Sequence, residues 1–242
     1  GQQEILHYLN FCVETLNLQR DIYLNERVSD ATWDEESQIW NINTASRKKF
    51  TARFLITAVG CLSSTNKPKI DGLPAFSGDV YHTGHWPHEP VIFDKKRVAV
   101  IGTGSSGIQA IPEIAKQAKK LFVLQRTPNY SVPARNQPLK PNFHSEFVKK
   151  IEFWRAKMME SRHGHPWVAP DREVEKTAKE KRLEIMERAW LHGGLSFRES
   201  FSDVLVSSES NEIMSEFIRQ KILKIVNNPE TANTLLPKDH PF

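Results

Sequence analysis

The fold is decided by the segment Arg97-Val98-Ala99-Val100-Ile101-Gly102-Thr103-Gly104-Ser105-Ser106-Gly107. Its apolar first half is typical of a β-strand, and it runs directly into a Gly-x-Gly-x-x-Gly turn. The apolar residues that follow, Ile108, Ile111 and Ile114, recur at helical spacing, and residues 121–126 are typical of a second strand. This order of elements predicts a βαβ unit that binds a dinucleotide. The alternative, a merely structural glycine turn, leaves both flanking elements unexplained.

The glycines of this turn have separate predicted roles. Gly102 allows the tight turn, Gly104 lets the backbone approach the pyrophosphate, and Gly107 lets the helix pack closely on the strand. The start of the helix offers N–H groups and the positive end of its dipole to the phosphates, with the hydroxyls of Ser105 and Ser106 nearby. These residues are therefore candidates for holding a pyrophosphate.

The end of the second predicted strand indicates which dinucleotide is bound. An NAD-binding protein usually places Asp or Glu there to hold the ribose 2′-hydroxyl, whereas this sequence has Gln125-Arg126-Thr127. A guanidinium can pair with a 2′-phosphate in bidentate fashion, which favours NADP over NAD. The alternative is that Arg126 is a surface residue at the end of a strand.

The first part of the chain has a different pattern. Residues 5–16 predict an amphipathic helix that packs on another element. A strand at 22–24 and a hairpin made of 27–33 and 39–43 are expected next. The apolar run 54–60 is typical of a strand buried on both faces of a parallel sheet. These strands are too few for a doubly wound sheet, so we expect its other strands to lie outside the chain.

The Pro- and Gly-containing stretch 63–78 predicts a linker. After a proline-containing loop at 127–141, helical periodicity returns in three segments, at 147–158, 174–190 and 213–225. Gly193-Gly194 is expected to end the second segment, and Asn227-Asn228-Pro229 the third.

The composition is that of an ordinary globular protein, with 39% hydrophobic and 26% charged residues among 242. The 33 basic and 29 acidic residues are spread along the chain, so the net charge of +4 favours a mixed solvated surface over nucleic-acid binding. No apolar run approaches the length of a membrane span, so no membrane partner is expected. Cys12 and Cys61 lie in apolar surroundings, which predicts reduced thiols in a core and a cytoplasmic protein.

Three histidines, His82, His85 and His88, recur at every third residue and raise the hypothesis of a zinc site. No Cys or carboxylate cluster is close to them in sequence, and an extended or turning chain would point the three rings in different directions. We therefore expect no metal.

A rarer pattern precedes the dinucleotide segment: Phe76-x-Gly78-x-x-x-His82-Thr83-x-x-Trp86-Pro87. At every fixed position it resembles the fingerprint of type I Baeyer–Villiger monooxygenases. Residues 125–136 and 237–242 resemble further landmarks of that family, so the resemblance covers essentially the whole chain. The phenylacetone, cyclohexanone and steroid monooxygenase branches are the most similar.

The resemblance implies an α/β fold, in which a Rossmann-like NADP-binding domain with a helical insertion follows the C-terminal part of an incomplete FAD-binding α/β domain. The implied boundaries are 1–62 for the partial FAD domain, 63–90 for a linker with the fingerprint, and 91–242 for the NADP domain. This last domain is expected to be truncated at its C-terminal end and to carry the insertion at about 143–228. The implied cofactors are FAD and NADP, and the implied reaction converts a small-molecule ketone and O₂ to an ester or lactone.

The resemblance also implies roles for individual residues. The fingerprint residues are expected to couple the two domains rather than to catalyse: Phe76, Gly78, His82, Thr83, Trp86 and Pro87. The pyrophosphate is expected to lie against Gly102, Thr103, Gly104, Ser105, Ser106 and Gly107, with Gln109 nearby. The 2′-phosphate role is implied for Arg126 and Thr127. Contacts with FAD are implied for Val28, Thr57, Ala58 and Gly60.

The sequence departs from a complete enzyme of that family. The first glycine-rich FAD turn and the flavin-proximal Asp are absent. The family continues beyond the equivalent of residue 242 to a Lys-Arg pair, in which the Lys helps to hold the 2′-phosphate and the Arg is the main catalytic residue. We therefore expect an internal fragment with no catalytic residue of its own, inactive alone and poor at binding FAD. Two alternatives stay open: an N- or S-oxygenating flavin monooxygenase, which usually lacks Thr83 and the Trp86-Pro87 pair, and a non-redox NADP-binding module.

Overall fold

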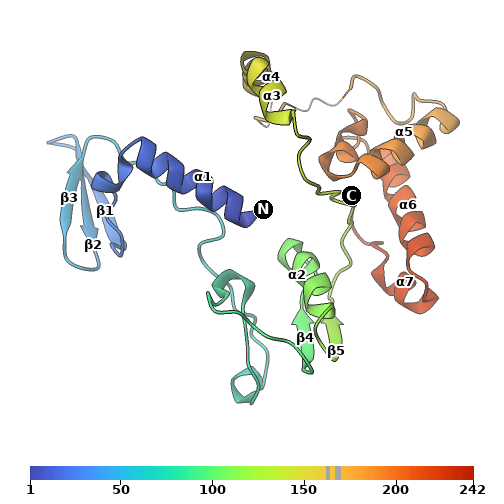
Figure 1. Cartoon of the computed structure of the whole chain (residues 1–242), viewed down its shortest axis with the longest axis horizontal. Helices are drawn as coiled ribbons and strands as arrows, with labels where there is room; N and C mark the ends of the chain where they lie inside the picture. Colours follow the sequence, from blue (N-terminus) through green and yellow to red (C-terminus); the bar gives the residue numbers. More distant parts are fainter. Residues whose placement is uncertain (162–163, 167–169) are drawn as a thin grey trace. The chain divides into compact units, whose positions relative to one another are not determined.

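The fold is taken from a computed structural model, which describes residues 1–161, 164–166 and 170–242 (Figure 1). The chain divides into two compact units, Gly1–Gly78 and Asp79–Phe242. The division therefore falls inside the fingerprint, between Gly78 and Asp79.

The first unit contains a helix and a small antiparallel sheet. Helix α1 spans Gln2–Thr15, and a 3₁₀ turn, η1, spans Leu18–Asp21. The sheet has the order β1-β2-β3, with β1 at Val28–Asp34, β2 at Ile39–Thr44 and β3 at Lys49–Ala52. The Asp34 carboxylate accepts the backbone N–H groups of Glu36 and Ser37, at 2.9 and 3.1 Å, which fixes the turn between β1 and β2.

Two strands expected in this unit are not formed. Residues 22–24 follow η1 as an irregular segment, and the apolar run 54–60 is not a strand. Phe54, Ile56 and Val59 are 81%, 86% and 75% exposed. A strand needs a neighbour to satisfy its N–H and C=O groups, and among the described residues none pairs with this run. The hairpin of β1 and β2, in contrast, is confirmed.

The predicted N-terminal helix is also confirmed, but no side chain of α1 is buried by the described residues. The expectation that it packs through its apolar face is therefore wrong for this structure. The expectation of two thiols in a core is wrong as well, because Cys61 is exposed and Cys12 is half-buried.

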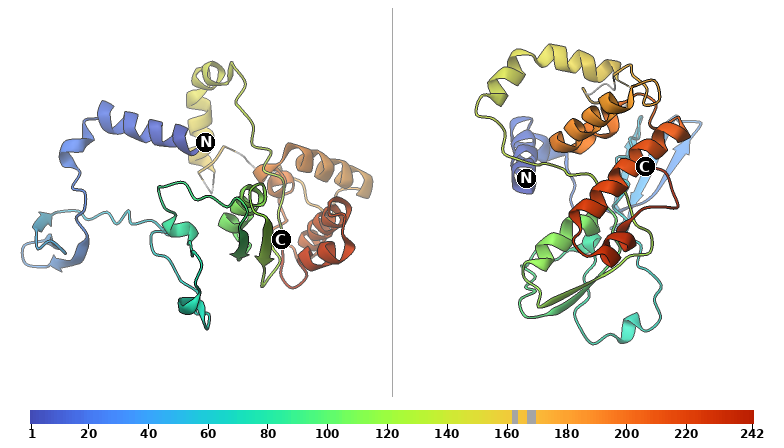
Figure 2. Two further views of the ribbon diagram at one scale, coloured as in Figure 1. Left: turned by 60° about the horizontal axis from the view of Figure 1, so that its bottom comes forward. Right: turned by 90° about the vertical axis from the view of Figure 1, so that its right-hand side faces the viewer.

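The second unit contains the predicted βαβ unit. Strands β4 (Arg97–Ile101) and β5 (Lys120–Leu124) pair in parallel, in register from Arg97 opposite Lys120 to Ile101 opposite Leu124. Helix α2 (Ser105–Ala115) connects the two strands and packs against both (Figure 2). Pro112 lies inside α2, and the helix continues past it to Ala115. The local sequence pattern was sufficient to predict these elements.

Five more helices of the described chain follow β5: α3 (Phe143–Lys149), α4 (Ile151–Glu160), α5 (Lys179–His192), α6 (Ser208–Ile225) and α7 (Pro229–Leu235). The first predicted helical segment is thus divided at Lys150. Gly193 ends α5 with φ +82°, as predicted. No helix in the part of the chain that the structure describes is long and apolar enough to cross a membrane.

Helix α7 was not predicted. The sequence around Pro229 was interpreted as the end of α6, and it is also the start of a new helix. The Asn228 side chain accepts the backbone N–H of Thr231 at 2.8 Å, and Pro229 occupies the first helical position. The same residue types end one helix and begin the next.

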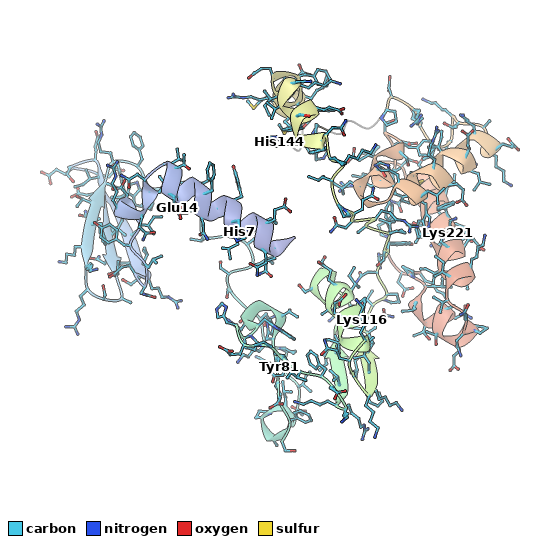
Figure 3. The ribbon with its side chains drawn as sticks, viewed as in Figure 1. His7, Glu14, Tyr81, Lys116, His144 and Lys221 are labelled. Carbon is cyan, nitrogen blue, oxygen red and sulfur yellow. The ribbon has the colours of Figure 1, made fainter. Side chains whose placement is uncertain are left out.

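The main hydrophobic core of the described residues lies around α5, α6 and the 3₁₀ turns η4 (Gly194–Ser196) and η5 (Arg198–Ser200), rather than in the βαβ unit. Its buried members are Val174, Ile185, Met186, Ala189, Trp190, Phe197, Phe201, Val204, Met214, Phe217 and Ile218. Lys221, labelled on α6 in Figure 3, forms an ion pair with Glu187 of α5 at 2.6 Å beside this core.

Candidate dinucleotide-binding site

The turn between β4 and α2 needs glycine at two positions for reasons internal to the chain. Gly102 has φ +99°, which L-residues rarely adopt, and its N–H donates to the Leu124 carbonyl at 2.9 Å. A Cβ atom on Gly107 would lie 2.4 Å from the carbonyl oxygen of Gly102. The predicted roles of these two glycines, a tight turn and close packing, agree with this geometry.

Gly104 differs from its two neighbours. Its φ is −70°, and a Cβ atom there would meet nothing within 4 Å. No contact within the described chain therefore requires glycine at this position. Gly104 is also the N-cap of α2, and no side chain caps the first N–H groups of the helix within the described residues. The start of α2 is consequently open space lined by backbone donors.

Thr103 is fastened to the segment that follows β5. Its hydroxyl donates to the Gln125 side-chain oxygen at 3.3 Å, and its carbonyl accepts the Asn129 amide at 3.4 Å. Gln125 in turn donates to the Thr234 carbonyl of α7 at 3.1 Å. The structure thus brings together the glycine turn, the end of β5 and α7. Sequence reasoning quoted Gln125 and Asn129 but gave them no role, and it missed Thr234.

Two predicted residues lie on one face of the first turns of α2. Gln109 donates from its amide to the Ser105 carbonyl at 2.8 Å. Gln109 and Ser106 both line the pocket described below. The Ser105 side chain is exposed at the start of the helix.

Arg126 and Thr127 lie where the sequence predicted them, directly after β5, and both are exposed. In the described ranges, Arg126 makes no ion pair with a carboxylate. Its charge is therefore available to an anion.

The loop after Arg126 is held by the last residues of the chain. The His240 ring lies with Nε2 at 2.8 Å from the Pro128 carbonyl oxygen and with Nδ1 at 3.0 Å from the Pro241 carbonyl oxygen. Tyr130 meets the same ring edge to face, with centroids 5.3 Å apart. The Pro128 carbonyl, followed by that of Pro241, raises the pKa of His240, because each can accept a hydrogen bond from an N–H of the charged ring.

Arg219 of α6 supports the same loop from the other side. Its guanidinium donates to the Tyr130 hydroxyl at 3.0 Å and to the Pro237 carbonyl at 3.4 Å. It also pairs with Glu216 at 2.8 Å and with Glu212. Burial lowers the pKa of Arg219, but the hydrogen bonds and charges of its partners raise it more, so it lies above the ordinary value. Arg219 therefore remains a cation that ties α6 to the loop.

The fingerprint residues of the second unit surround a short 3₁₀ turn, η3 (Thr83–His85), with His82 before it and Trp86 after it. His82 caps this turn, because its Nδ1 accepts the Gly84 N–H at 3.0 Å. Within the first unit, the Phe76 ring covers Gly78 so closely that a Cβ atom on Gly78 would lie 2.7 Å from the ring. His82 and Gly78 thus each have a local conformational reason for their residue type.

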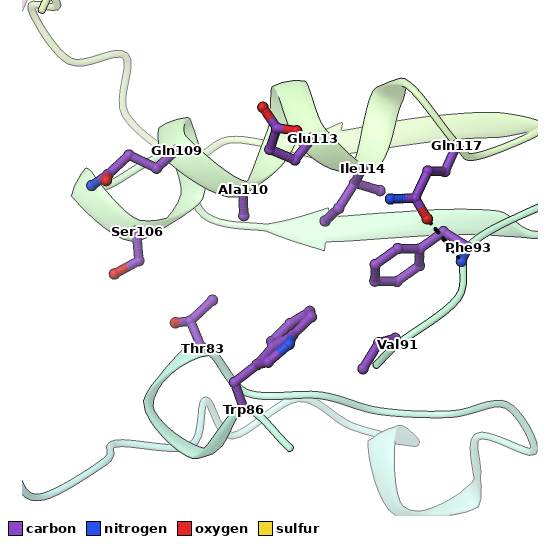
Figure 4. A pocket seen from close by; sticks show the side chains of 10 residues that line it. All are labelled: Thr83, Trp86, Val91, Phe93, Ser106, Gln109, Ala110, Glu113, Ile114 and Gln117. Carbon is purple, nitrogen blue, oxygen red and sulfur yellow. Dashed lines mark hydrogen bonds between the residues drawn. The ribbon is translucent and has the colours of Figure 1, made fainter. Parts of the chain in front are cut away.

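An open pocket of about 520 Å³ lies between the fingerprint turn and α2 (Figure 4). Thr83 and Trp86 line one side, and Ser106 and Gln109 line the other. The Trp86 ring contacts Tyr81 and Phe93, with centroids 5.7 and 6.2 Å apart. The remaining lining residues are Val91, Phe93, Ala110, Glu113, Ile114 and Gln117. The fingerprint therefore faces the helix that begins at the glycine turn.

The residues implied for FAD lie in the first unit. Val28 begins β1, opposite Thr44 of β2. Thr57, Ala58 and Gly60 lie on the exposed segment 54–60, where Gly60 has φ +74°. The backbone of this segment is accessible.

The histidine spacing does not create a metal centre in the described residues. No group of three or more His, Cys, Asp or Glu side chains there is arranged to hold a metal ion. The His82 and His85 rings lie with their centroids 6.3 Å apart.

The parallel βαβ unit with its glycine turn defines an α/β protein with the fold of a dinucleotide-binding domain. Residues 1–223 match the pyridine nucleotide-disulphide oxidoreductase family, and the chain belongs to this family. The solved structure of an oxidized steroid monooxygenase bound to NADP is similar with a TM-score of 0.94 and 42% sequence identity. The similarity covers 99% of this chain and 46% of that one.

Curated relatives extend this comparison. The chain is 38% identical to cyclohexanone 1,2-monooxygenase of Acinetobacter sp, over 98% of this chain and 44% of the relative. It is 37% identical to a phenazine N-monooxygenase of Lysobacter antibioticus, over the same 98% and 44%. Because the relatives include Baeyer–Villiger monooxygenases, the resemblance noted in the sequence is confirmed. The chain spans less than half the length of these relatives.

Proposed function

We propose that the chain supplies the NADPH-binding part of a flavin-dependent monooxygenase that converts ketones and O₂ to esters or lactones. The observation that carries this proposal is the pocket shared by the fingerprint and α2. Thr83 and Trp86 line it together with Ser106 and Gln109, which belong to the first turns of the helix at the glycine turn. A fingerprint that couples nucleotide binding to another part of an enzyme needs such a contact.

The residues of the glycine turn fit a pyrophosphate. Gly102 and Gly107 are explained by the chain itself, whereas Gly104 leaves a space that a side chain would fill. The open N–H groups of α2 and the positive end of its dipole stabilise an anion in that space. We assign pyrophosphate binding to Gly102, Thr103, Gly104, Ser105, Ser106 and Gly107, with Gln109 beside them.

The residues after β5 fit a 2′-phosphate. Arg126 is exposed and has no carboxylate partner in the described part of the chain, and Thr127 adds a hydroxyl beside it. A guanidinium forms two parallel hydrogen bonds with a phosphate, and it has no such anion to bind on NADH. We therefore propose that Arg126 and Thr127 select NADPH.

When bound, NADPH and FAD supply the hydride and oxygen-transfer chemistry. The residues of this chain bind and orient the nucleotide. Trp86, Val91 and Phe93 form an apolar side of the pocket between fingerprint and helix. We assign no residue of the chain to the oxygen-transfer step, and we propose that the 242-residue chain alone is inactive.

For FAD, the accessible backbone at Thr57, Ala58 and Gly60 and the start of β1 at Val28 fit contacts with a flavin nucleotide. We propose residues 1–62 as part of an FAD domain, 63–90 as a linker, and 91–242 as the NADP domain with its insertion at about 143–228. We also propose a cytoplasmic location, since both cysteines are free thiols.

The activity is tested with the full-length protein that contains this chain. Purified protein is incubated with FAD, NADPH and a panel of linear and cyclic ketones, and the products are identified by mass spectrometry. Ester or lactone formation that requires NADPH and O₂ supports the proposal, and NADPH consumption without any oxygenated ketone contradicts it. The same assay with the 242-residue chain tests whether that chain is inactive alone. Formation of product at enzymatic rates would overturn this expectation.

A second candidate function is N-oxygenation of a heteroaromatic substrate. The similarity to a phenazine N-monooxygenase is nearly as high as that to cyclohexanone 1,2-monooxygenase, at 37% against 38%, over the same share of the chain. Overall sequence identity therefore does not separate the two reactions. Phenazine added to the ketone assay as a competing substrate distinguishes them, because an N-oxide as the main product favours this second function.

A further inference from the structure

The loop that carries Arg126 and Thr127 is anchored at three points between Gln125 and Asn129, in addition to the contact of Arg219 with Tyr130. Gln125, at its start, binds Thr103 and the Thr234 carbonyl, and Asn129, near its end, binds the Thr103 carbonyl. The third anchor is the hydrogen bond between His240 and the Pro128 carbonyl, at 2.8 Å. Of these three anchors, His240 alone is made by an ionisable side chain.

Both nitrogens of the His240 ring face carbonyl oxygens, at 2.8 and 3.0 Å. A carbonyl oxygen accepts hydrogen bonds and cannot donate one, and a neutral imidazole has only one N–H group. The neutral ring can therefore satisfy one of these contacts but not both. The imidazolium satisfies both, so the contacts select the charged form.

The surroundings of the ring agree with a positive charge. Asp239 is adjacent and favours the cation, and the Tyr130 ring contacts the imidazole edge to face. The cation Arg219 donates to the Tyr130 hydroxyl and is balanced by Glu212 and Glu216. Lys238, two residues before His240, is exposed. The pKa of His240 is raised, mainly by the Pro128 carbonyl.

We propose that the His240 imidazolium is a positioning group that holds the Arg126–Thr127 loop in its NADPH-binding conformation. Deprotonation removes one of its two N–H donors, so the Pro128 carbonyl competes with that of Pro241 for the proton that remains. Preference for NADPH over NADH then falls as pH rises through the pKa of His240, although His240 does not touch the phosphate. This inference rests on the proposed NADP site and adds that the protonation of His240 controls its preference for NADPH.

The 2′-phosphate titrates as well, and its effect has the opposite sign. Its second pKa is about 6, so binding to Arg126 strengthens as pH rises through that value. A pH profile of affinity therefore reports His240 only when a variant without the imidazole is measured beside it. His240→Phe keeps a ring against Tyr130 and removes both donors. His144→Phe is the matched control, since His144 is exposed on α3 (Figure 3).

The experiment measures dissociation constants of NADPH and NADH by fluorescence for the unsubstituted 242-residue chain and both variants, from about pH 5.5 to about pH 9. At the acid end of the range, the unsubstituted chain and His144→Phe should prefer NADPH about five- to tenfold more strongly than His240→Phe. This advantage should disappear above the pKa of His240. An unsubstituted chain with no preference for NADPH overturns the NADP assignment, and this inference with it. If His240→Phe prefers NADPH as strongly as the unsubstituted chain at every pH, the role of His240 is overturned while the NADP assignment stands.

A second readout does not depend on affinity or on the variant folding. The Cε1–H resonance of His240, followed by NMR across the same pH range without nucleotide and then with NADPH or NADH, gives its pKa in each state. A value above that of an exposed histidine, raised further by NADPH but not by NADH, supports the inference, because linkage is reciprocal. An ordinary value that NADPH leaves unchanged overturns it.

Discussion

The α-carbon of Gly107 faces the carbonyl oxygen of Gly102 so closely that a Cβ atom on Gly107 would lie 2.4 Å from it. The obstacle is a backbone atom, which cannot rotate away as the end of a side chain can. Gly104, two residues from Gly102, has no such neighbour within 4 Å. A contact within the described chain therefore requires glycine at position 107 but not at position 104, and substitutions can separate the two positions.

Gly107→Ala should destabilise the chain by about 1–3 kcal/mol, because the added methyl group forces the turn apart. Gly104→Ala should leave stability within about 0.5 kcal/mol, since φ is −70° and the space is open. Affinity for NADPH should nevertheless fall in Gly104→Ala, because the methyl group occupies the space proposed for the pyrophosphate. Urea unfolding and NADPH titration of both variants give the four values. Unchanged NADPH affinity in a folded Gly104→Ala chain would contradict the assigned role.

Arg126→Ala should weaken NADPH binding by about 1.5–3 kcal/mol, the loss expected for a hydrogen bond to a charged group. NADH binding should stay the same, because NADH lacks the 2′-phosphate. Arg126→Lys should recover only part of the loss, since an ammonium cannot form the paired bonds. Isothermal titration with both nucleotides measures this, with Arg188→Ala as the control, because the Arg188 side chain of α5 is exposed. Equal losses for NADPH and NADH would remove the NADP assignment.

The Glu26 carboxylate should titrate far below the ordinary range. Lys48 donates to it at 2.6 Å, and this hydrogen bond, helped by Ser46, lowers its pKa from 4.5 to about 2. A carboxyl with a depressed pKa stabilises the folded state fully above its ordinary pKa, and the contribution disappears as pH falls through about 2. Carboxyl carbon NMR of the chain gives the midpoint directly. Lys48→Met should move this midpoint up towards 4.5, and an unmoved midpoint would refute the assigned cause.

Asp203 should be important for the stability of the helical core. Its buried carboxylate accepts the Val174 N–H at 3.0 Å and the Ser210 hydroxyl at 2.5 Å. Asp203→Ala leaves these donors without an acceptor, which costs about 1–3 kcal/mol for each buried group left unsatisfied. Asp203→Asn keeps one acceptor oxygen and should lose less. Urea unfolding measures both, with the exposed Asp171→Ala as the control, and equal losses for Asp171 and Asp203 would contradict the argument.

The elements predicted correctly are those whose signal is local. β4, α2 and β5 follow from apolar periodicity and the glycine spacing within 28 consecutive residues, 97–124. The end of α5 at Gly193 likewise needs only the residue itself. The run 54–60 was misinterpreted because its apolar character indicates burial only when a neighbouring strand is present to pair with it. Helix α7 was missed because a proline after asparagine both ends and begins helices.

The candidate site divides in the same way. The glycines and Arg126 could be assigned from the sequence, since their chemistry depends on residue type and on position after a strand. The contacts that anchor the loop with Arg126 could not be predicted from the sequence. Gln125 and Thr234 are 109 residues apart, and His240 and Pro128 are 112 residues apart, so no local pattern relates them.

The sequence by itself determined the dinucleotide turn, the charge at the end of β5 and the family resemblance, because each depends on neighbouring residues along the chain. The tertiary structure alone decided that Gly107 faces a carbonyl oxygen, that the fingerprint lines a pocket with α2, and that His240 meets Pro128. These contacts join distant segments, and they form only when helices and loops pack. Packing therefore decides how the candidate nucleotide site is held, whereas the local sequence decides where its glycines and Arg126 stand.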